Sequence, residues 1–100
     1  MRMMNLQEIT RAMGKLDNWV LDGEFITKEL EFSEFRKAID FVNEVAKVAE
    51  KNNHHPEIII NFNVVRLSLT THSAKSLTEL DFKVAEEIDK IYEIPSESID

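Results

Sequence analysis

Residues 57–71 read EIIINFNVVRLSLTT, and this stretch decides the fold. It contains two β-rich runs, residues 57–62 and 65–71, and the intervening Asn63-Val64 fits a tight hairpin turn. In the second run apolar and polar side chains alternate, as in a strand with one covered face. The successive isoleucines of the first run predict a central strand covered on both faces.

A long amphipathic helix is predicted before this hairpin. Ser33 is its expected N-cap, and Asn52 and Asn53 end it, helped by Pro56 shortly afterwards. Its apolar positions follow the helical period over about four turns. They are Phe35, Ala38, Ile39, Val42, Val45, Ala46 and Ala49.

A second hairpin is predicted further upstream. Asp22-Gly23 lies between apolar runs, and a type I′ turn needs positive φ at both central residues. The strand after it has a mostly apolar face, on which Lys28 is the charged exception. The members of that face are Ile26, Lys28, Leu30 and Phe32.

Two shorter helices are predicted at the ends of the chain. In the first, Asn5 and Glu8 form a capping pair and Gly14 ends the helix. In the last, Thr78 is the cap and Asp81 follows it by three residues. The expected apolar stripes are Leu6, Ile9 and Met13 in the first helix, and Phe82, Ala85, Ile88 and Tyr92 in the last.

The order α-β-β-α-β-β-α predicts an α+β fold: a four-stranded antiparallel sheet with helices packed on one face. A chain of 100 residues fits a single domain, here residues 1–94, followed by a frayed polar tail at residues 95–100. We expect Trp19 and Phe62 to pack in the core.

Composition excludes several classes of function. With no cysteine, the chain has no disulfide, thiolate metal site or cysteine nucleophile. A net charge of −7 opposes nucleic-acid binding. There is no signal peptide and no apolar run long enough to cross a membrane, so we expect a soluble, cytoplasmic protein.

The three histidines are His54, His55 and His72. With a turn at Asn63-Val64, His72 lies opposite His55, and a shift of one residue puts it opposite His54. Directly opposed Cβ atoms are about 5 Å apart, so the spacing predicts that the imidazoles converge.

Three interpretations of this cluster are open. The histidines can be unrelated surface or capping residues. They can bind a metal ion, although adjacent residues of an extended chain point to opposite faces and no fourth ligand is evident. They can also carry out metal-free acid–base chemistry, because imidazole both accepts and donates protons near neutral pH.

The spacing around the histidines resembles that of the pterin-4a-carbinolamine dehydratases. The pattern is His54-His55-Pro56, an aromatic residue six positions later (Phe62), a histidine ten further on (His72), and an aspartate nine after that (Asp81). The resemblance covers some seventy residues, from about Trp19 to about Ile88. A pattern with fixed gaps is far more specific than a single dipeptide.

The resemblance implies an enzyme that removes water from 4a-hydroxytetrahydropterin to give the quinonoid dihydropterin, with no metal or other cofactor. One imidazole would protonate the departing hydroxyl, another would take the N5 proton, and Asp81 would orient a histidine. Glu50 matches an acidic residue near the family's site, although a solvated role suits it equally well. By similarity, the substrate is bound by His54, His55, Pro56, Thr71, His72, Ser73 and Ala74.

The resemblance carries two further expectations and one departure. Family members are often dimers or tetramers, and an edge strand is a plausible association surface, so we expect a homo-oligomer. Some members assist the dimerisation of a transcription factor, so the alternative function is a protein-interaction module with little catalysis. Ser76 stands where members usually have glycine, which leaves the loop after His72 uncertain.

Overall fold

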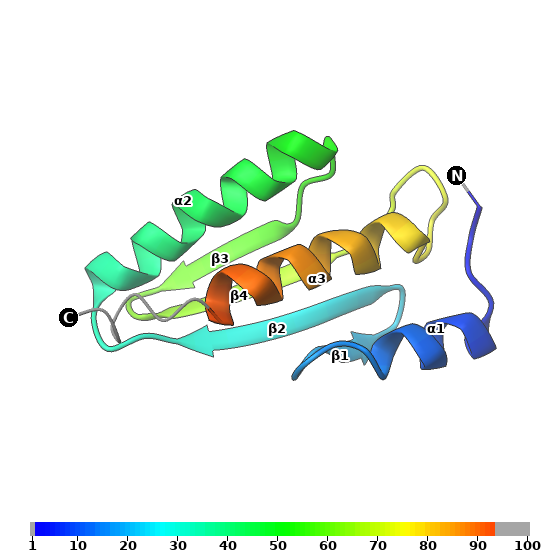
Figure 1. The fold of residues 1–100 in the computed structure, drawn as a ribbon, viewed down its shortest axis with the longest axis horizontal. Helices are drawn as coiled ribbons and strands as arrows, with labels where there is room; N and C mark the ends of the chain where they lie inside the picture. The colour runs from blue at the N-terminus through cyan, green and yellow to red at the C-terminus, as the bar shows by residue number, and fades with distance from the viewer. Residues whose placement is uncertain (1, 94–100) are drawn as a thin grey trace.

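A computed structural model describes residues 2–93 and has the predicted element order (Figure 1). The predicted tail at residues 95–100 lies outside the described residues. No helix within residues 2–93 is long and apolar enough to cross a membrane. The elements are α1 (Leu6–Met13), β1 (Val20–Asp22), β2 (Phe25–Glu31), α2 (Phe35–Asn52), β3 (Glu57–Asn61), β4 (Val64–Leu69) and α3 (Glu79–Glu93).

The four strands form one antiparallel sheet in the order β1-β2-β4-β3. The predicted α+β fold is therefore confirmed. The helices α2 and α3 run side by side over the sheet (Figure 1). Beneath them is the apolar face of the central strands, with Ile26, Leu30, Val65, Leu67 and Leu69 almost fully buried.

The strand β3 lies at an edge of the sheet, so the prediction of a central strand is wrong. Ile59 and Ile60 are 49% and 37% exposed. The central position belongs to β4, which pairs with both β2 and β3. A run of isoleucines indicates a strand, but it does not reveal which neighbours the strand finds.

Both predicted hairpins form, but each turn lies one residue from its expected place. In the β3–β4 hairpin the turn is Phe62-Asn63, and Phe62 has φ 55° and is 68% exposed, so its predicted core role is wrong. In the β1–β2 hairpin Asp22 pairs with Phe25. Only the first central residue, Gly23, has positive φ, as in a type II′ turn.

The buried stripe of α2 is rotated from the predicted one. Phe41 is buried, whereas Phe35 is half exposed and Ala46 is exposed. The rotation places Phe41 against Phe32 and Tyr92, with ring centroids 5.2 and 5.9 Å away. The predicted Ser33 cap is also wrong, because the helix begins after Glu34 without a side-chain cap. The fully covered positions of α2 are Ala38, Phe41, Val45 and Ala49.

The two terminal helices begin at the predicted caps. Asn5 and Glu8 form a complete capping box in α1, and α3 begins directly after Thr78. The stripes differ at single positions: Leu6 and Tyr92 are exposed, and Val84 is buried as well as Phe82, Ala85 and Ile88. Trp19 is buried as predicted.

The charged exception on the sheet face, Lys28, is paired in the core. Its Nζ donates to Asp89 Oδ1 at 2.9 Å, and the side chains of Lys28 and Asp89 are only 4% and 12% exposed. Asp89 also accepts from Trp19 Nε1 at 2.8 Å and from the backbone N–H of Asp17 at 3.3 Å. This carboxylate therefore joins β2, the segment before β1, and α3.

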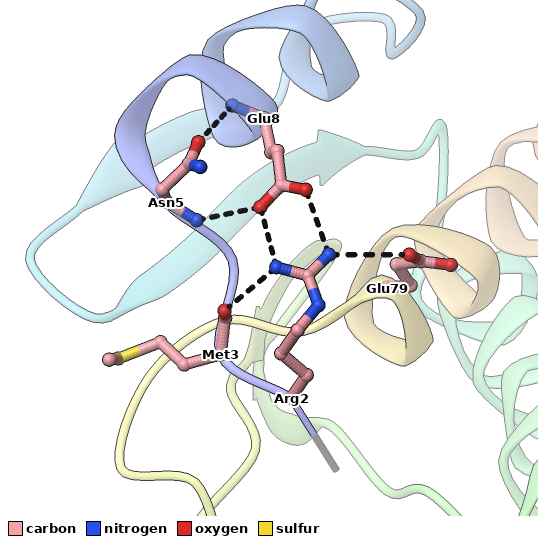
Figure 2. A network of polar contacts seen from close by, with 5 residues as sticks. All are labelled: Arg2, Met3, Asn5, Glu8 and Glu79. Atoms are coloured by element: carbon pink, nitrogen blue, oxygen red, sulfur yellow. Dashed lines mark hydrogen bonds and ion pairs between the residues drawn. The ribbon is translucent and has the colours of Figure 1, made fainter.

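The N-terminal segment is fastened beside the start of α3 (Figure 2). The Arg2 guanidinium donates to both carboxylate oxygens of Glu8 at 2.8 and 2.9 Å and lies 3.8 Å from Glu79. The Arg2 hydrogen bonds and the N–H of Asn5 lower the pKa of Glu8 from its ordinary 4.5 to about 2. A backbone bond from Met4 N–H to the Leu77 carbonyl completes this attachment.

We expect Asp89→Asn to destabilise the protein more than Lys28→Met. Without the carboxylate, the Lys28 ammonium is buried and uncompensated, which costs about 3–5 kcal/mol. Without Lys28, Asp89 keeps its two N–H donors, so the cost is about 1–3 kcal/mol. Urea unfolding of both variants and the wild type measures the difference, and equal losses would contradict this account of the pair.

We expect Glu8→Gln to lower stability at pH 7 but not near pH 2. Because the folded-state pKa of Glu8 is depressed to about 2, its contribution is full above pH 4.5 and disappears as the pH falls from 4.5 towards 2. Thermal midpoints of both proteins at pH 7, 4 and 2.5 test this. A gap that stays constant across this range would contradict it.

Candidate active site

The end of α2 positions His54. Asn53 adopts the left-handed conformation with φ 49°, which asparagine tolerates. The N–H of His54 then donates to the Ala49 carbonyl at 3.0 Å, and the N–H of Asn53 to that of Glu50 at 3.2 Å. These two bonds form a Schellman motif, so the backbone around His54 is fixed by the helix end.

A polar contact between the helices braces the same end of α2. Asn52 Nδ2 donates to Glu87 Oε1 at 3.1 Å, and Lys51 Nζ lies 3.1 Å from the same oxygen. Burial raises the pKa of Glu87, but the bonds from Asn52 and Lys51 outweigh it and leave the pKa below its ordinary value. The carboxylate therefore stays charged and holds α2 against α3.

The centre of the site is the fully buried carboxylate of Asp81, on the first turn of α3. Its Oδ1 is 2.6 Å from His54 Nε2. Its Oδ2 accepts from Thr71 Oγ1 at 2.7 Å and from the N–H of Thr78 at 2.9 Å. A buried carboxylate with three donors is satisfied as the ionised form.

The Asp81 contact determines the tautomer of His54. A carboxylate only accepts hydrogen bonds, so Nε2 of His54 carries the ring proton and donates a hydrogen bond to Asp81. In the neutral ring Nδ1 is then the nitrogen that can accept a hydrogen bond. The His54 side chain is 12% exposed, so it remains reachable from solvent.

His55 has a similar partner in a different environment. Its Nε2 lies 2.6 Å from Glu50 Oε2, but the two side chains are 54% and 77% exposed. Water screens such a pair, so it orients the His55 ring more weakly than Asp81 orients His54.

His72 lies in a tight turn and not on the β3–β4 ladder. The last ladder pair is Glu57 with Ser68, so the predicted cross-strand pairing of His72 with His55 or His54 is wrong. Instead, Thr71 and Ser76 exchange backbone bonds of 3.1 and 3.4 Å, and His72 is exposed in the loop they close. The left-handed residue of this loop is Lys75, with φ 55°, so Ser76 needs no glycine-like conformation.

Thr71 connects this turn to His54. The Thr71 hydroxyl donates to Asp81, and the next residue in the chain is His72. The two separated stretches that carry histidines therefore meet at the Asp81 carboxylate. The remaining residues expected to bind substrate lie beside them: Pro56 and Ala74 are half-buried, and Ser73 is exposed.

Two hydroxyl groups of the site were missed in the sequence. Thr78 was expected to cap α3 with its side chain, but its Oγ1 bonds Thr71 Oγ1 at 2.8 Å. Thr71 is expected from the resemblance to bind substrate, but its hydroxyl bonds Asp81 at 2.7 Å. The Thr78–Asp81 spacing indicated a local contact at the start of α3, and the Thr78 N–H does donate to Asp81, but it gave no signal for Thr71.

Two other features of the described residues bear on ligand binding. No three His, Asp or Glu side chains within residues 2–93 gather closely enough to hold a metal ion. A groove of about 340 Å³ lies between α1 and α3, but none of the histidines lines it. Each wall carries both signs of charge, with Glu8, Arg11 and Lys15 on the side of α1 and Glu79, Lys83 and Glu86 on α3.

The chain is similar to a family model and to several proteins that carry the same family name. The family model described as "Pterin 4 alpha carbinolamine dehydratase" matches residues 2–91. A Sulfurisphaera tokodaii protein named "Putative pterin-4-alpha-carbinolamine dehydratase" is 37% identical, covering 91% of this chain and 98% of the relative. A Trichormus variabilis protein of the same name is 43% identical, covering 84% of this chain and 90% of the relative.

Two solved structures are also similar. One is described as a transcriptional coactivator/pterin dehydratase from Brucella melitensis, with a TM-score of 0.86, 38% identity, and coverage of 90% of this chain and 98% of that one. The other is a pterin dehydratase-like protein identified as a RuBisCO assembly factor in the alpha-carboxysome. Its TM-score is 0.65 at 19% identity, over 75% of this chain and 89% of that one, so it supports the fold alone.

Proposed function

The chain belongs to the pterin-4-alpha-carbinolamine dehydratase family, and we propose that it removes water from a 4a-hydroxytetrahydropterin by histidine acid–base catalysis. The observation that carries this proposal is the bond between His54 and the buried Asp81. These two residues belong to the family pattern, and their contact gives one imidazole a defined tautomer and a stabilising charge.

The proposed reaction breaks one C–O bond. An imidazolium donates a proton to the C4a hydroxyl, which departs as water, and a second imidazole takes the N5 proton as the C4a=N5 double bond forms. We assign the base to His54, because Asp81 stabilises the imidazolium that this step creates. His72 is then the proposed acid, and His55 with Pro56 positions the pterin ring.

A second candidate function is a protein-interaction module with little catalysis. The observation that favours it is apolar surface left uncovered on α2, where Phe35 is 50% exposed and Ala46 is exposed. Apolar surface of this kind is typical of contacts with other proteins. The Brucella melitensis relative is named as a coactivator as well as a dehydratase, so the two functions are compatible in one fold.

We expect the purified protein to accelerate dehydration of synthetic 4a-hydroxytetrahydropterin, and His54→Ala and His72→Ala to lower kcat by about 100-fold or more. Stopped-flow absorbance measures the rate. Lys47→Ala, on the solvated face of α2, is the matched control and should leave the rate unchanged. Wild-type turnover no faster than that of both histidine variants would reject catalysis and leave the interaction module.

We also propose that the protein forms a homo-oligomer through the edge strand β3. Both β1 and β3 are edges, but β3 is longer, with five residues against three. The exposed side chains of Ile59, Ile60 and Phe62 lie along it or at its turn. An exposed apolar edge favours pairing with another strand, and a second copy of the same edge supplies one.

We expect light scattering to give a mass above the 11.6 kDa of one chain, and Ile59→Lys to shift the protein towards the monomer. Val20→Lys is the matched control, because Val20 is 60% exposed on the other edge strand. A wild-type monomer at micromolar concentration, or dissociation by Val20→Lys alone, would reject assembly through β3.

A further inference from the structure

We propose that Thr71 is a positioning residue, whose hydroxyl couples the segment of His72 to the ring of His54 through Asp81. This inference rests on the proposed function, in which both imidazoles act on one substrate. The geometry points to Thr71 because its hydroxyl bonds the same Asp81 carboxylate that contacts His54, and because the next residue in the chain is His72.

The hydrogen bonds at Asp81 have a defined direction. Thr71 has one hydroxyl proton, and the Asp81 carboxylate, which accepts only, must receive it. The 2.8 Å contact between the hydroxyls is therefore donated by Thr78 to Thr71. The result is a chain from Thr78 through Thr71 to Asp81, met from the other side by His54 Nε2–H.

This direction ranks the two threonines. If the Thr71 hydroxyl is removed, Asp81 loses a donor and the Thr78 hydroxyl loses its acceptor. If the Thr78 hydroxyl is removed, Thr71 still donates to Asp81, and the N–H of Thr78 still holds Oδ2. We therefore expect the Thr71 hydroxyl to matter more to His54 than the Thr78 hydroxyl.

The Thr71 backbone provides the second half of the coupling. Its N–H and C=O bond Ser76, and its C=O also accepts from Ala74 N–H at 3.1 Å. These bonds close the turn in which His72 lies. Because the side chain of the same residue is held by Asp81, the turn cannot shift without disturbing the carboxylate that orients His54.

Thr70 is a matched control from the adjacent position. It is 8% exposed, against 6% for Thr71, and its Oγ1 makes one hydrogen bond, to the Glu24 carbonyl at 2.6 Å. Thr70→Val therefore removes a buried hydroxyl and one hydrogen bond away from Asp81, whereas Thr71→Val removes the bonds to Asp81 and Thr78. A loss that arises only from destabilisation should appear in both variants.

The experiment compares Thr71→Val, Thr71→Ser, Thr78→Val and Thr70→Val by turnover and by proton NMR of the His54 Nε2–H, assigned with His54→Ala. We expect Thr71→Val to lower kcat about tenfold with KM roughly unchanged, which indicates lost positioning rather than lost binding. Thr71→Ser should restore most of kcat, Thr78→Val should lose less than Thr71→Val, and Thr70→Val should match the wild type. The Nε2–H resonance should move in Thr71→Val and stay in place in Thr70→Val.

The proposal is overturned by an unmoved Nε2–H resonance in Thr71→Val, by equal kcat losses in Thr70→Val and Thr71→Val, or by a larger loss in Thr78→Val. If Thr71→Val does not fold, Thr71→Cys replaces it, because a thiol is a weaker hydrogen-bond donor than a hydroxyl. The kcat of Thr71→Cys should then be lower than that of Thr71→Ser but not zero. If the wild type shows no turnover, the dehydratase function is rejected. The NMR comparison uses no substrate, so it still tests whether Thr71 is coupled to the His54 ring through Asp81.

Discussion

The structure depends on one constraint: a carboxylate buried in the core must find donors for its oxygens. The helix α3 carries two such groups, Asp81 and, about two turns later, Asp89. Each accepts three hydrogen bonds. Those to Asp89 come from the distant Asp17, Trp19 and Lys28, whereas Asp81 contacts His54, Thr71 and the nearby N–H of Thr78. No buried side-chain polar atom in the described part of the chain lacks a partner. Because unpaired burial is costly, these bonds determine where the surrounding segments lie.

The two carboxylates serve different ends with the same chemistry. Asp89 compensates Lys28 and joins the sheet to the segment before β1, which makes it part of the framework. Asp81 instead gathers the end of α2, the turn after β4 and the start of α3, and these are the segments that bring the histidine stretches together. One helix therefore provides both the anchor of the core and the centre of the candidate site.

Outside this hydrogen-bond network, α2 and β3 leave apolar side chains exposed. The core-facing side of α2 is determined by Phe41 and its aromatic neighbours, so Phe35, at the margin of that side, is left half exposed. The edge strand β3 likewise leaves its isoleucines partly uncovered. A fully satisfied interior with apolar residues at its margins is compatible with both the association and the catalysis proposed above.

The element order, the capping box at Asn5, the start of α3 after Thr78 and the end of α2 follow from the sequence alone, because they depend on neighbours within a few residues. The family pattern is also readable there, because it consists of residue types at fixed spacings. The sequence did not determine that β3 is an edge, where the hairpin turns lie, or how α2 is rotated. Strand order and register depend on pairing between distant segments, and the side of a helix that is buried depends on what it meets. Only the tertiary structure joined Lys28 to Asp89 and His54 to Asp81, because a buried charge is explained by its partner, and that partner lies far away in the sequence.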